Sequence, residues 1–265
     1  MNASLQRIYA LVLRHIHIWR SSIMRIVDSI YWPAVQMVTW GFMTQFLSGQ
    51  TSYVGQAFGV LLSGLMLWEV VVRGNLSLSI AFLEEMWSRN LGHLFVSPIR
   101  SWELATGIII VAILRTLLGM IPVSLMAWAF FGYSIYTLGL PLLAFFVILQ
   151  MFSWSIGLMM SGLIMRVGQS AETFAWAAVF ILLPLSGVYY PITVLPHWMQ
   201  AISHVIPTSY VFEGMRTILR DHSVQWHLLA ISAGLSVVYL VVGFQVFLWF
   251  FRSSRRHGSL LTHGE

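Results

Sequence analysis

The sequence predicts an all-α integral membrane protein, and three observations support this class. Of its 265 residues, 58% are hydrophobic and only 9% are charged, whereas about a quarter of the residues of a soluble domain are charged. Between Glu103 and Arg166 the only acidic or basic residue is Arg115. Apolar stretches long enough to cross a bilayer as helices recur along the chain. We therefore expect one membrane domain covering residues 1–265.

The first expected element is an amphipathic helix over residues 1–29, lying on the membrane surface. Apolar residues such as Leu5, Ile8 and Leu11 recur at helical spacing, and arginines occupy much of the opposite face. These arginines, without a clean apolar run or a cleavage site, argue against a signal peptide. A helix that is merely solvated is the alternative.

Six apolar segments follow, each a candidate transmembrane helix. They cover residues 30–47, 57–81, 104–131, 138–165, 173–188 and 228–251, and the fifth is short. An even number of spans puts both termini on one side of the membrane. Ten arginines fall on that side, whereas only Arg216 and Arg220 fall on the opposite side. Because positively charged loops stay in the cytoplasm, we expect both termini to be cytoplasmic.

The fifth predicted span runs into a segment broken by three prolines and a glycine, between Pro184 and Pro196. Unpaired backbone groups are costly in lipid, so this segment must lie in protein, in a water-filled path or at the interface. Two short amphipathic helices, 196–206 and 207–219, follow it, and each begins with a proline suited to a first helical turn. We expect residues 189–220 to form an external re-entrant helical hairpin between the fifth and sixth spans. An ordinary loop on the membrane surface is the alternative.

Three ionisable residues fall within the predicted spans, where charged groups are expensive and typical of function. Glu69 and Arg115 lie near the bilayer midplane. Arg73 follows Glu69 by four residues and therefore shares its helix face. Pairing of Glu69 with Arg73 or with Arg115 would limit the cost of burial. Glu69, Arg73 and Arg115 then form either a structural ion pair or part of a substrate path.

The connection from Phe82 to Glu103 mixes charged residues with exposed apolar ones. It should form a short amphipathic helix that ends near Gly92 or Pro98. Apolar side chains on an exposed charged helix indicate docking to another protein, with packing on the membrane surface as the alternative.

Several kinds of site are excluded by composition. All 14 basic residues are arginine, so a phosphate-binding loop ending in lysine is impossible and the chain cannot be a P-loop ATPase by itself. The absence of cysteine excludes thiolate metal sites, and the nine histidines form no convincing metal site. The net charge of +5 reflects arginines that set orientation rather than a nucleic-acid partner.

The order of these elements and a set of short motifs resemble the membrane subunit of type-2 ABC exporters. This group includes exporters of capsule, O-antigen, teichoic acid, daunorubicin-type drugs and nodulation factors. The resemblance covers essentially the whole chain. Its motifs are Ser97-Pro98-Ile99, Ser186-Gly187 with Tyr190-Pro191, Leu195-Pro196, Ile206-Pro207 and Glu213-Gly214-Met215-Arg216. Many polysaccharide exporters carry Asn-Pro where this chain has Ile206-Pro207, which favours the drug or lipid-like branch.

The resemblance implies a non-enzymatic permease subunit in the bacterial inner membrane, embedded among membrane lipids. It would work as a dimer with a second permease copy and two separate ATPase subunits, which would bind the ATP and Mg. This chain would bind no cofactor, carry no catalytic residue, and move a lipid-linked, glycan or drug-like substrate out of the cytoplasm. The implied ATPase-coupling residues are Glu84, Glu85, Trp87, Arg89, Leu91, His93 and Arg100. The implied external gate comprises Pro184, Ser186, Gly187, Tyr189, Tyr190 and Pro191.

Two other classes are the alternatives. An ATP-independent secondary transporter or channel should show an internal repeat with paired breaks in its two halves. Here only the C-terminal half has a strong break. A membrane enzyme should show several ionisable residues at one depth within a recognisable motif, and neither feature is evident.

Overall fold

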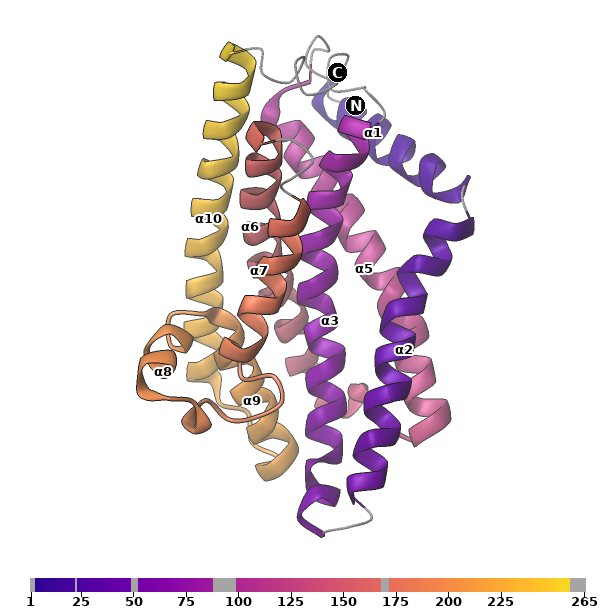
Figure 1. Ribbon diagram of the computed structural model, residues 1–265, viewed down its shortest axis with the longest axis vertical. Helices are drawn as coiled ribbons and strands as arrows, with labels where there is room; N and C mark the ends of the chain where they lie inside the picture. Colours follow the sequence, from indigo (N-terminus) through magenta and orange to yellow (C-terminus); the bar gives the residue numbers. More distant parts are fainter. Residues whose placement is uncertain (1–2, 22, 49–51, 88–98, 168–171, 258–265) are drawn as a thin grey trace.

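The computed structural model describes residues 3–21, 23–48, 52–87, 99–167 and 172–257, and every regular element in these ranges is a helix. This confirms the predicted all-α class (Figure 1). The α-helices are α1 (Ala3–Arg20), α2 (Ile23–Ser48), α3 (Ser52–Trp87), α5 (Ser101–Phe131), α6 (Leu140–Val167), α7 (Glu172–Leu185), α8 (His197–Ser203), α9 (Pro207–Asp221) and α10 (Trp226–His257). Two short 3-10 helices, η1 (Ile135–Leu138) and η3 (Ile192–Val194), lie in the connections.

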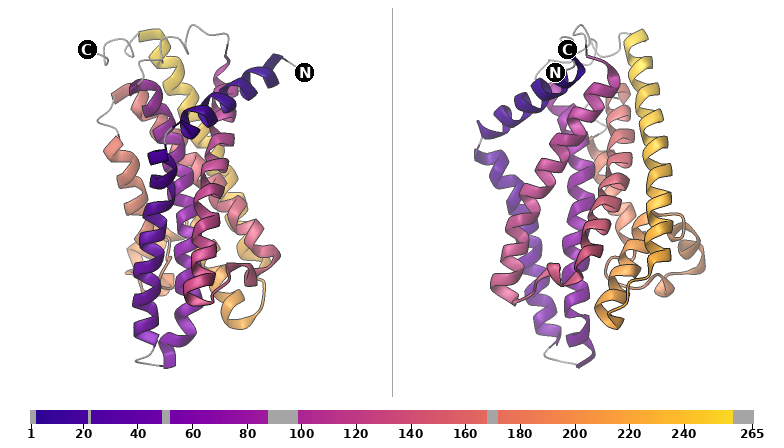
Figure 2. Two further views of the ribbon diagram at one scale, coloured as in Figure 1. Left: turned by 90° about the vertical axis from the view of Figure 1, so that its right-hand side faces the viewer. Right: turned by 180° about the vertical axis from the view of Figure 1, so that it is seen from behind.

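The long helices α2, α3, α5, α6 and α10 run lengthwise through the molecule (Figures 1 and 2). Helix α1 and the last turns of α10 lie at the same end of the molecule, whereas α8 and α9 lie in the opposite half. Helix α7 begins toward the α1 end and stops partway along the molecule, where the chain turns toward α8. The sequence predicts an even number of spans, with both termini on one side of the membrane. The common position of α1 and the last turns of α10 agrees with this prediction.

Among the described residues, four helices are long and apolar enough to cross a membrane. Their spanning segments are Phe58–Ala81, Trp102–Phe131, Leu140–Ile164 and Trp226–Ser253, which confirm the second, third, fourth and sixth predicted spans. The first predicted span lies in α2, which carries Arg25 and Asp28 near its start. The fifth lies in α7, whose 14 residues extend only about 21 Å, against a hydrocarbon core of about 30 Å. Both segments are helical, and their crossing of the membrane stays a prediction.

Helix α3 is the central element of the bundle. In an 18-residue apolar stretch of its spanning segment 78% of the residues are buried, compared with 22% in the corresponding stretch of α10 at the periphery. Glycines allow neighbouring backbones to approach closely, as is common where membrane helices pack. A Cβ atom at Gly157 of α6 would lie 2.8 Å from Leu78 Cβ, and one at Gly64 would lie 2.8 Å from the Val188 carbonyl oxygen. Side chains on α3 are therefore held between α6 and the broken segment.

The N-terminal helix is shorter than predicted, and it packs against α5. Helix α1 ends at Arg20, and residues 23–29 belong to α2 instead of the predicted surface helix. Its apolar residues Ile8 and Leu11 are buried, and Leu11 contacts Gly107 of α5. The guanidinium of Arg7 lies 3.1 Å from the Glu103 carboxylate at the start of α5. Helix α1 is thus attached to α5, and its position at a membrane surface stays a prediction.

The connection between the second and third spans does not begin as a separate helix. Helix α3 continues without a break through Trp87, because the chain has no glycine or proline between Asn75 and Trp87. Glu84 and Glu85 therefore belong to the last turns of α3. Residues 88–98 lie outside the described residues, so the predicted end near Gly92 or Pro98 is not tested.

The two short helices expected after the broken segment are confirmed. Pro196 is the N-cap residue of α8, and Pro207 is the first residue of α9. Helix α9 buries one face, including Val211, Phe212 and Met215, within the core shared with α3 and α6. This burial fixes α9 against the long helices. Whether the pair re-enters the membrane stays a prediction.

Candidate functional site

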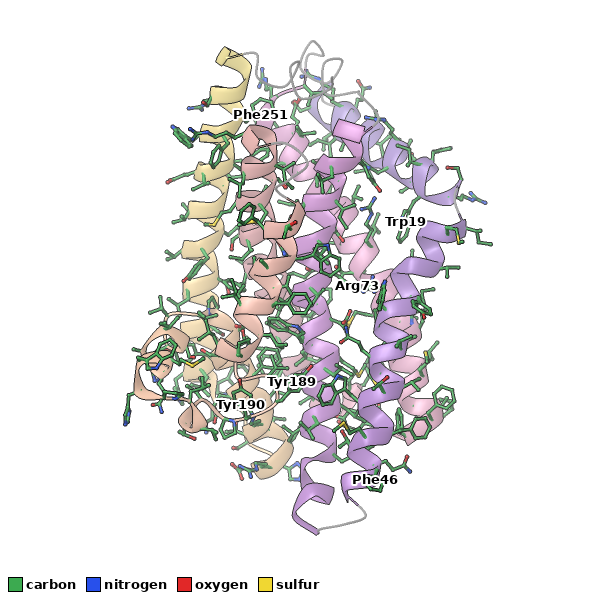
Figure 3. The ribbon with its side chains drawn as sticks, viewed as in Figure 1. Trp19, Phe46, Arg73, Tyr189, Tyr190 and Phe251 are labelled. Carbon is green, nitrogen blue, oxygen red and sulfur yellow. The ribbon has the colours of Figure 1, made fainter. Side chains whose placement is uncertain are left out.

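A cavity of about 700 Å³ lies between α1, α2, α3, α5 and α7. Half of its lining residues come from α3, which contacts α2 and α7. Trp19 of α1 and Arg73 of α3 mark two of its walls (Figure 3). The lining residues are Trp19, Met24, Trp32, Gln36, Glu69, Val72, Arg73, Leu76, Ser77, Ile80, Glu84, Arg115, Trp176 and Phe180. All three ionisable residues that the sequence placed within the spans therefore line one cavity.

Two ion pairs provide the charged groups of this cavity. Arg73 Nε lies 3.4 Å from Glu69 Oε2, one helical turn away on α3. Arg115 on α5 donates a hydrogen bond of 3.1 Å to Glu84 on α3. The pairing of Glu69 with Arg73 confirms one of the two predicted alternatives. Arg115 pairs with Glu84 instead. Glu84 lies 15 residues after Glu69 on α3, about 22 Å along the helix axis, so the two ion pairs lie at different levels of the bundle.

The two arginines of the cavity are held by further contacts. The Arg115 guanidinium carbon lies 5.7 Å from the centre of the Trp19 ring, a cation–π arrangement that ties α1 to α5. Arg73 lies over Gly119 of α5, where an added Cβ atom would come within 2.6 Å of Arg73 Nε. Glu69 and Arg115 are both buried, with 4% and 8% of their surfaces exposed. These charged side chains therefore form part of the contacts between α1, α3 and α5.

The broken segment forms a second polar cluster, in the half of the molecule away from α1. Gly187 adopts a left-handed conformation with φ of 63°, which a glycine reaches without strain. Ser186 donates its hydroxyl to the Leu182 carbonyl at 2.7 Å and accepts a hydrogen bond from Thr208 of α9 at 2.7 Å. The Tyr190 hydroxyl donates to the Pro184 carbonyl at 3.0 Å. The predicted gate residues therefore form one connected turn.

Arg216 of α9 completes this turn, and sequence reasoning missed it. Its guanidinium donates to the carbonyl oxygens of Gly187 and Tyr190, the latter at 2.7 Å, and pairs with Glu213 at 2.7 Å. Only 5% of Arg216 is exposed. From the sequence, Arg216 is expected only as a loop arginine that sets orientation and as the last residue of the Glu213-Gly214-Met215-Arg216 motif. A broken backbone in an apolar environment leaves carbonyl groups that need hydrogen-bond donors. This need is the signal that could have pointed to a nearby arginine.

The two tyrosines of the broken segment take different partners. The Tyr189 ring stacks on Trp40 of α2, with 5.3 Å between ring centres and 21° between planes. Tyr190 instead bonds back to Pro184. Both lie farther from α1 than Arg73 does (Figure 3). Tyr189 consequently links the broken segment to α2, the helix that also borders the cavity.

The residues expected to couple the chain to an ATPase are only partly described. Glu84 is engaged with Arg115 in the cavity, and Arg100 precedes α5, where its backbone N–H donates to Glu103 at 2.9 Å. Glu85 and Trp87 lie in the last turns of α3. Arg89, Leu91 and His93 lie outside the described residues. The Glu103 carboxylate also binds Arg7, a contact between α1 and α5 that the sequence did not indicate.

Comparison with known proteins identifies similar sequences. The family described as ABC-2 type transporter matches residues 7–219. The inner membrane transport permease YadH of Escherichia coli strain K12 is 25% identical over 212 residues, covering 75% of this chain and 80% of that protein. The proteins of the same name from Escherichia coli O157:H7 and Shigella flexneri give the same values. The matched region contains both polar clusters described above.

Proposed function

This chain belongs to the ABC-2 type transporter family, and from that premise we propose that it is the permease subunit of an ATP-driven exporter. It is a multi-pass inner membrane transport permease. The proposed cycle moves a lipid-linked, glycan or drug-like substrate out of the cytoplasm, with ATP and Mg bound by a separate ATPase chain. The observation that carries this proposal is the cavity lined by Glu69, Arg73, Glu84 and Arg115 within membrane-spanning helices.

The placement of charge in this cavity supports a translocation path shared by two permease copies. Ion pairs at membrane depth rarely face lipid and are typical of interior or water-filled surfaces. The rim of the cavity on α2 and α7 is nevertheless exposed, with 57% of Trp32 and 64% of Phe180 accessible. A second copy that covers this rim would remove the charged groups from lipid contact. The two cavities would then face one another across a common path.

The geometry of α3 supports coupling to an ATPase partner. Because the chain has no lysine, it cannot form a P-loop, so ATP-driven transport requires an ATPase on another subunit. The predicted coupling segment begins at the end of α3, where Glu85 and Trp87 lie. The same unbroken helix carries Glu69 and Arg73 in the cavity. A displacement of its end by an ATPase would therefore move the wall of the cavity directly.

Co-purification with a candidate ATPase, such as one encoded by an adjacent gene, tests the assignment. We expect the double charge reversal Glu85→Arg, Arg89→Glu to abolish the complex, since it inverts the proposed contact surface. Glu84 is left intact because its carboxylate is already engaged with Arg115. The control is Arg220→Gln, which changes an exposed arginine of α9 in the opposite half of the molecule.

Transport by reconstituted vesicles separates this proposal from the alternative. We expect substrate movement to require both the ATPase and ATP, and to be lost with the charge-reversed variant. An intact complex in that variant would refute the coupling assignment. Transport by this chain alone, driven by an ion gradient, would instead support an ATP-independent secondary transporter or channel.

A further inference from the structure

The cavity stops just short of the broken segment on three of its walls. Its last lining residues at this end are Gln36 on α2, Glu69 on α3 and Phe180 on α7. The broken segment contacts α2 at Trp40 and α3 at Gly64, and it continues directly from the end of α7 at Leu185. These positions lie four or five residues beyond the last lining residues, about 6 to 7.5 Å along each helix. The broken segment therefore lies across the end of the cavity away from α1.

On the side of α3 and α9, backbone contacts hold the broken segment in place. The Val188 carbonyl oxygen packs so closely on α3 that a Cβ atom added at Gly64 would lie 2.8 Å from it. From α9, the Arg216 guanidinium binds the carbonyl oxygens of Gly187 and Tyr190. Separation of this contact would leave carbonyl groups without donors in an apolar environment, which is costly. The broken segment is therefore fixed to α3 and α9.

The contact with α2 is of another kind, a stack of two aromatic rings. The rings of Trp40 and Tyr189 lie 5.3 Å apart and are inclined by 21°. Tyr189 lies on the far side of Arg73 from Trp19, toward the end of the cavity (Figure 3). Trp40 is exposed, so its ring has room to turn away from Tyr189. Separation of two ring faces leaves no backbone group without a partner, and this contact is therefore the easier one to open.

We propose that the stack of Trp40 on Tyr189 is the closed gate at the predicted external end of the cavity. The gate opens when Trp40 leaves the ring of Tyr189, while the backbone of the broken segment stays fixed. The inference rests on the proposed function, since only a translocation path requires a gate. It assigns to the gate a residue of α2, in addition to the predicted residues of the broken segment. The moving partner is then on α2.

Labelling of a cysteine inside the cavity from the external side tests this proposal. The chain has no cysteine, and Gln36→Cys introduces one in the cavity lining, one helical turn from Trp40. The reagent is a membrane-impermeant methanethiosulfonate applied to intact cells. Each rate is divided by the rate for the same variant in permeabilised cells, which corrects for the reactivity of the thiol. We expect Trp40→Ala to raise this ratio about tenfold, and an unchanged ratio would overturn the proposal.

Paired substitutions distinguish a gate made by two rings from a general loosening of the fold. Tyr189→Ala should raise the labelling ratio as much as Trp40→Ala. The double variant should add nothing further, because either change alone removes the stack. Additive increases would show that the two side chains act independently and would contradict the proposal. Tyr189→Phe keeps the ring and should match the parent Gln36→Cys chain, as should Phe46→Ala, which removes an exposed ring from the same helix.

The labelling measurement needs no ATP, ATPase or substrate, so its outcome is separate from the exporter assignment. If Trp40→Ala admits the reagent but no ATPase co-purifies, the gate stands and the exporter assignment fails. If the complex forms and transports while Trp40→Ala has no effect on labelling, the gate alone fails. Thr193→Cys, in η3 of the broken segment, should be labelled equally with and without Trp40→Ala. A Thr193→Cys chain that is not labelled in intact cells would overturn the external position of the gate.

Discussion

A guanidinium group has several donors in one plane, and Arg216 uses this geometry to bind two carbonyl oxygens of the broken segment. Gly187 and Tyr190 supply these carbonyls, at positions where the helical ladder of α7 has ended. Glu213 balances the charge of the arginine. One buried side chain from α9 thus satisfies a backbone that would otherwise be costly in an apolar environment.

Replacing Arg216 should therefore destabilise the broken segment. For Arg216→Gln we expect a loss of about 2–3 kcal/mol, because two hydrogen bonds from a charged donor disappear. The midpoint of thermal unfolding in detergent should fall by about 5 °C. Arg216→Lys should recover only part of this loss, since lysine lacks the planar fork. Arg220→Gln, one turn later on the same helix and exposed, should leave the midpoint unchanged.

The conformation of Gly187 gives a second prediction at this scale. Gly187→Ala should cost about 1–2 kcal/mol, because a side chain is disfavoured at φ of 63°. The added Cβ atom would also lie 3.1 Å from the Tyr190 carbonyl oxygen. Gly234→Ala in α10 is the matched control, since nothing lies within 4 Å of its added Cβ atom. It should stabilise the helix by about 0.5–1 kcal/mol. Thermal unfolding of both variants checks the contrast, and equal effects would contradict it.

Among the helices, α3 joins the predicted coupling segment to the cavity. Its last turns contain Glu85 and Trp87, where the predicted coupling segment begins, and its middle contains Glu69 and Arg73 of the cavity. Helix α1 makes a second connection between the start of α5, where Arg7 binds Glu103, and the cavity, where Trp19 covers Arg115. Movements near the start of α5 should therefore reach the cavity through α1 as well as through α3.

Removing the charge of Glu103 should release α1 from α5. Glu103→Gln weakens the contact with Arg7 and the cap on the Arg100 backbone N–H. We expect faster amide hydrogen exchange across α1, with little change in α6 or α10, because only α1 and the start of α5 lose contacts. Glu213→Gln in α9 is a control in the other half of the molecule and should not alter exchange in α1. Unchanged exchange in α1 of the Glu103 variant would refute the attachment.

For the whole molecule, the common position of α1 and the end of α10 agrees with the arginine bias of the sequence (Figure 1). The exposed end of α6 at Arg166 is predicted on this same side of the membrane. Thr193, in η3 near α8, is predicted on the opposite side. On this prediction, the half of the molecule that contains α1 is cytoplasmic and the half that contains the broken segment is external.

The absence of cysteine allows this orientation to be tested with single cysteine variants. In intact cells a membrane-impermeant maleimide should label Thr193→Cys. It should label Leu5→Cys and Arg166→Cys only after the membrane is permeabilised. The cysteine-free chain is the control for background labelling. Labelling of the position 5 or position 166 variant in intact cells would reverse or refute the assigned topology.

The sequence by itself determined the membrane class, four spanning helices and the two short helices after the break, and it offered Arg73 as one of two partners for Glu69. These features depend on apolar length, on proline position and on a four-residue spacing within one helix, all of which are local. Only the tertiary structure decided that Arg115 pairs with Glu84, that Arg216 binds the broken segment and that α1 is attached to α5 through Glu103. Those partners are 31, 26 and 96 residues apart, and such contacts depend on how separate helices pack, which local spacing does not specify.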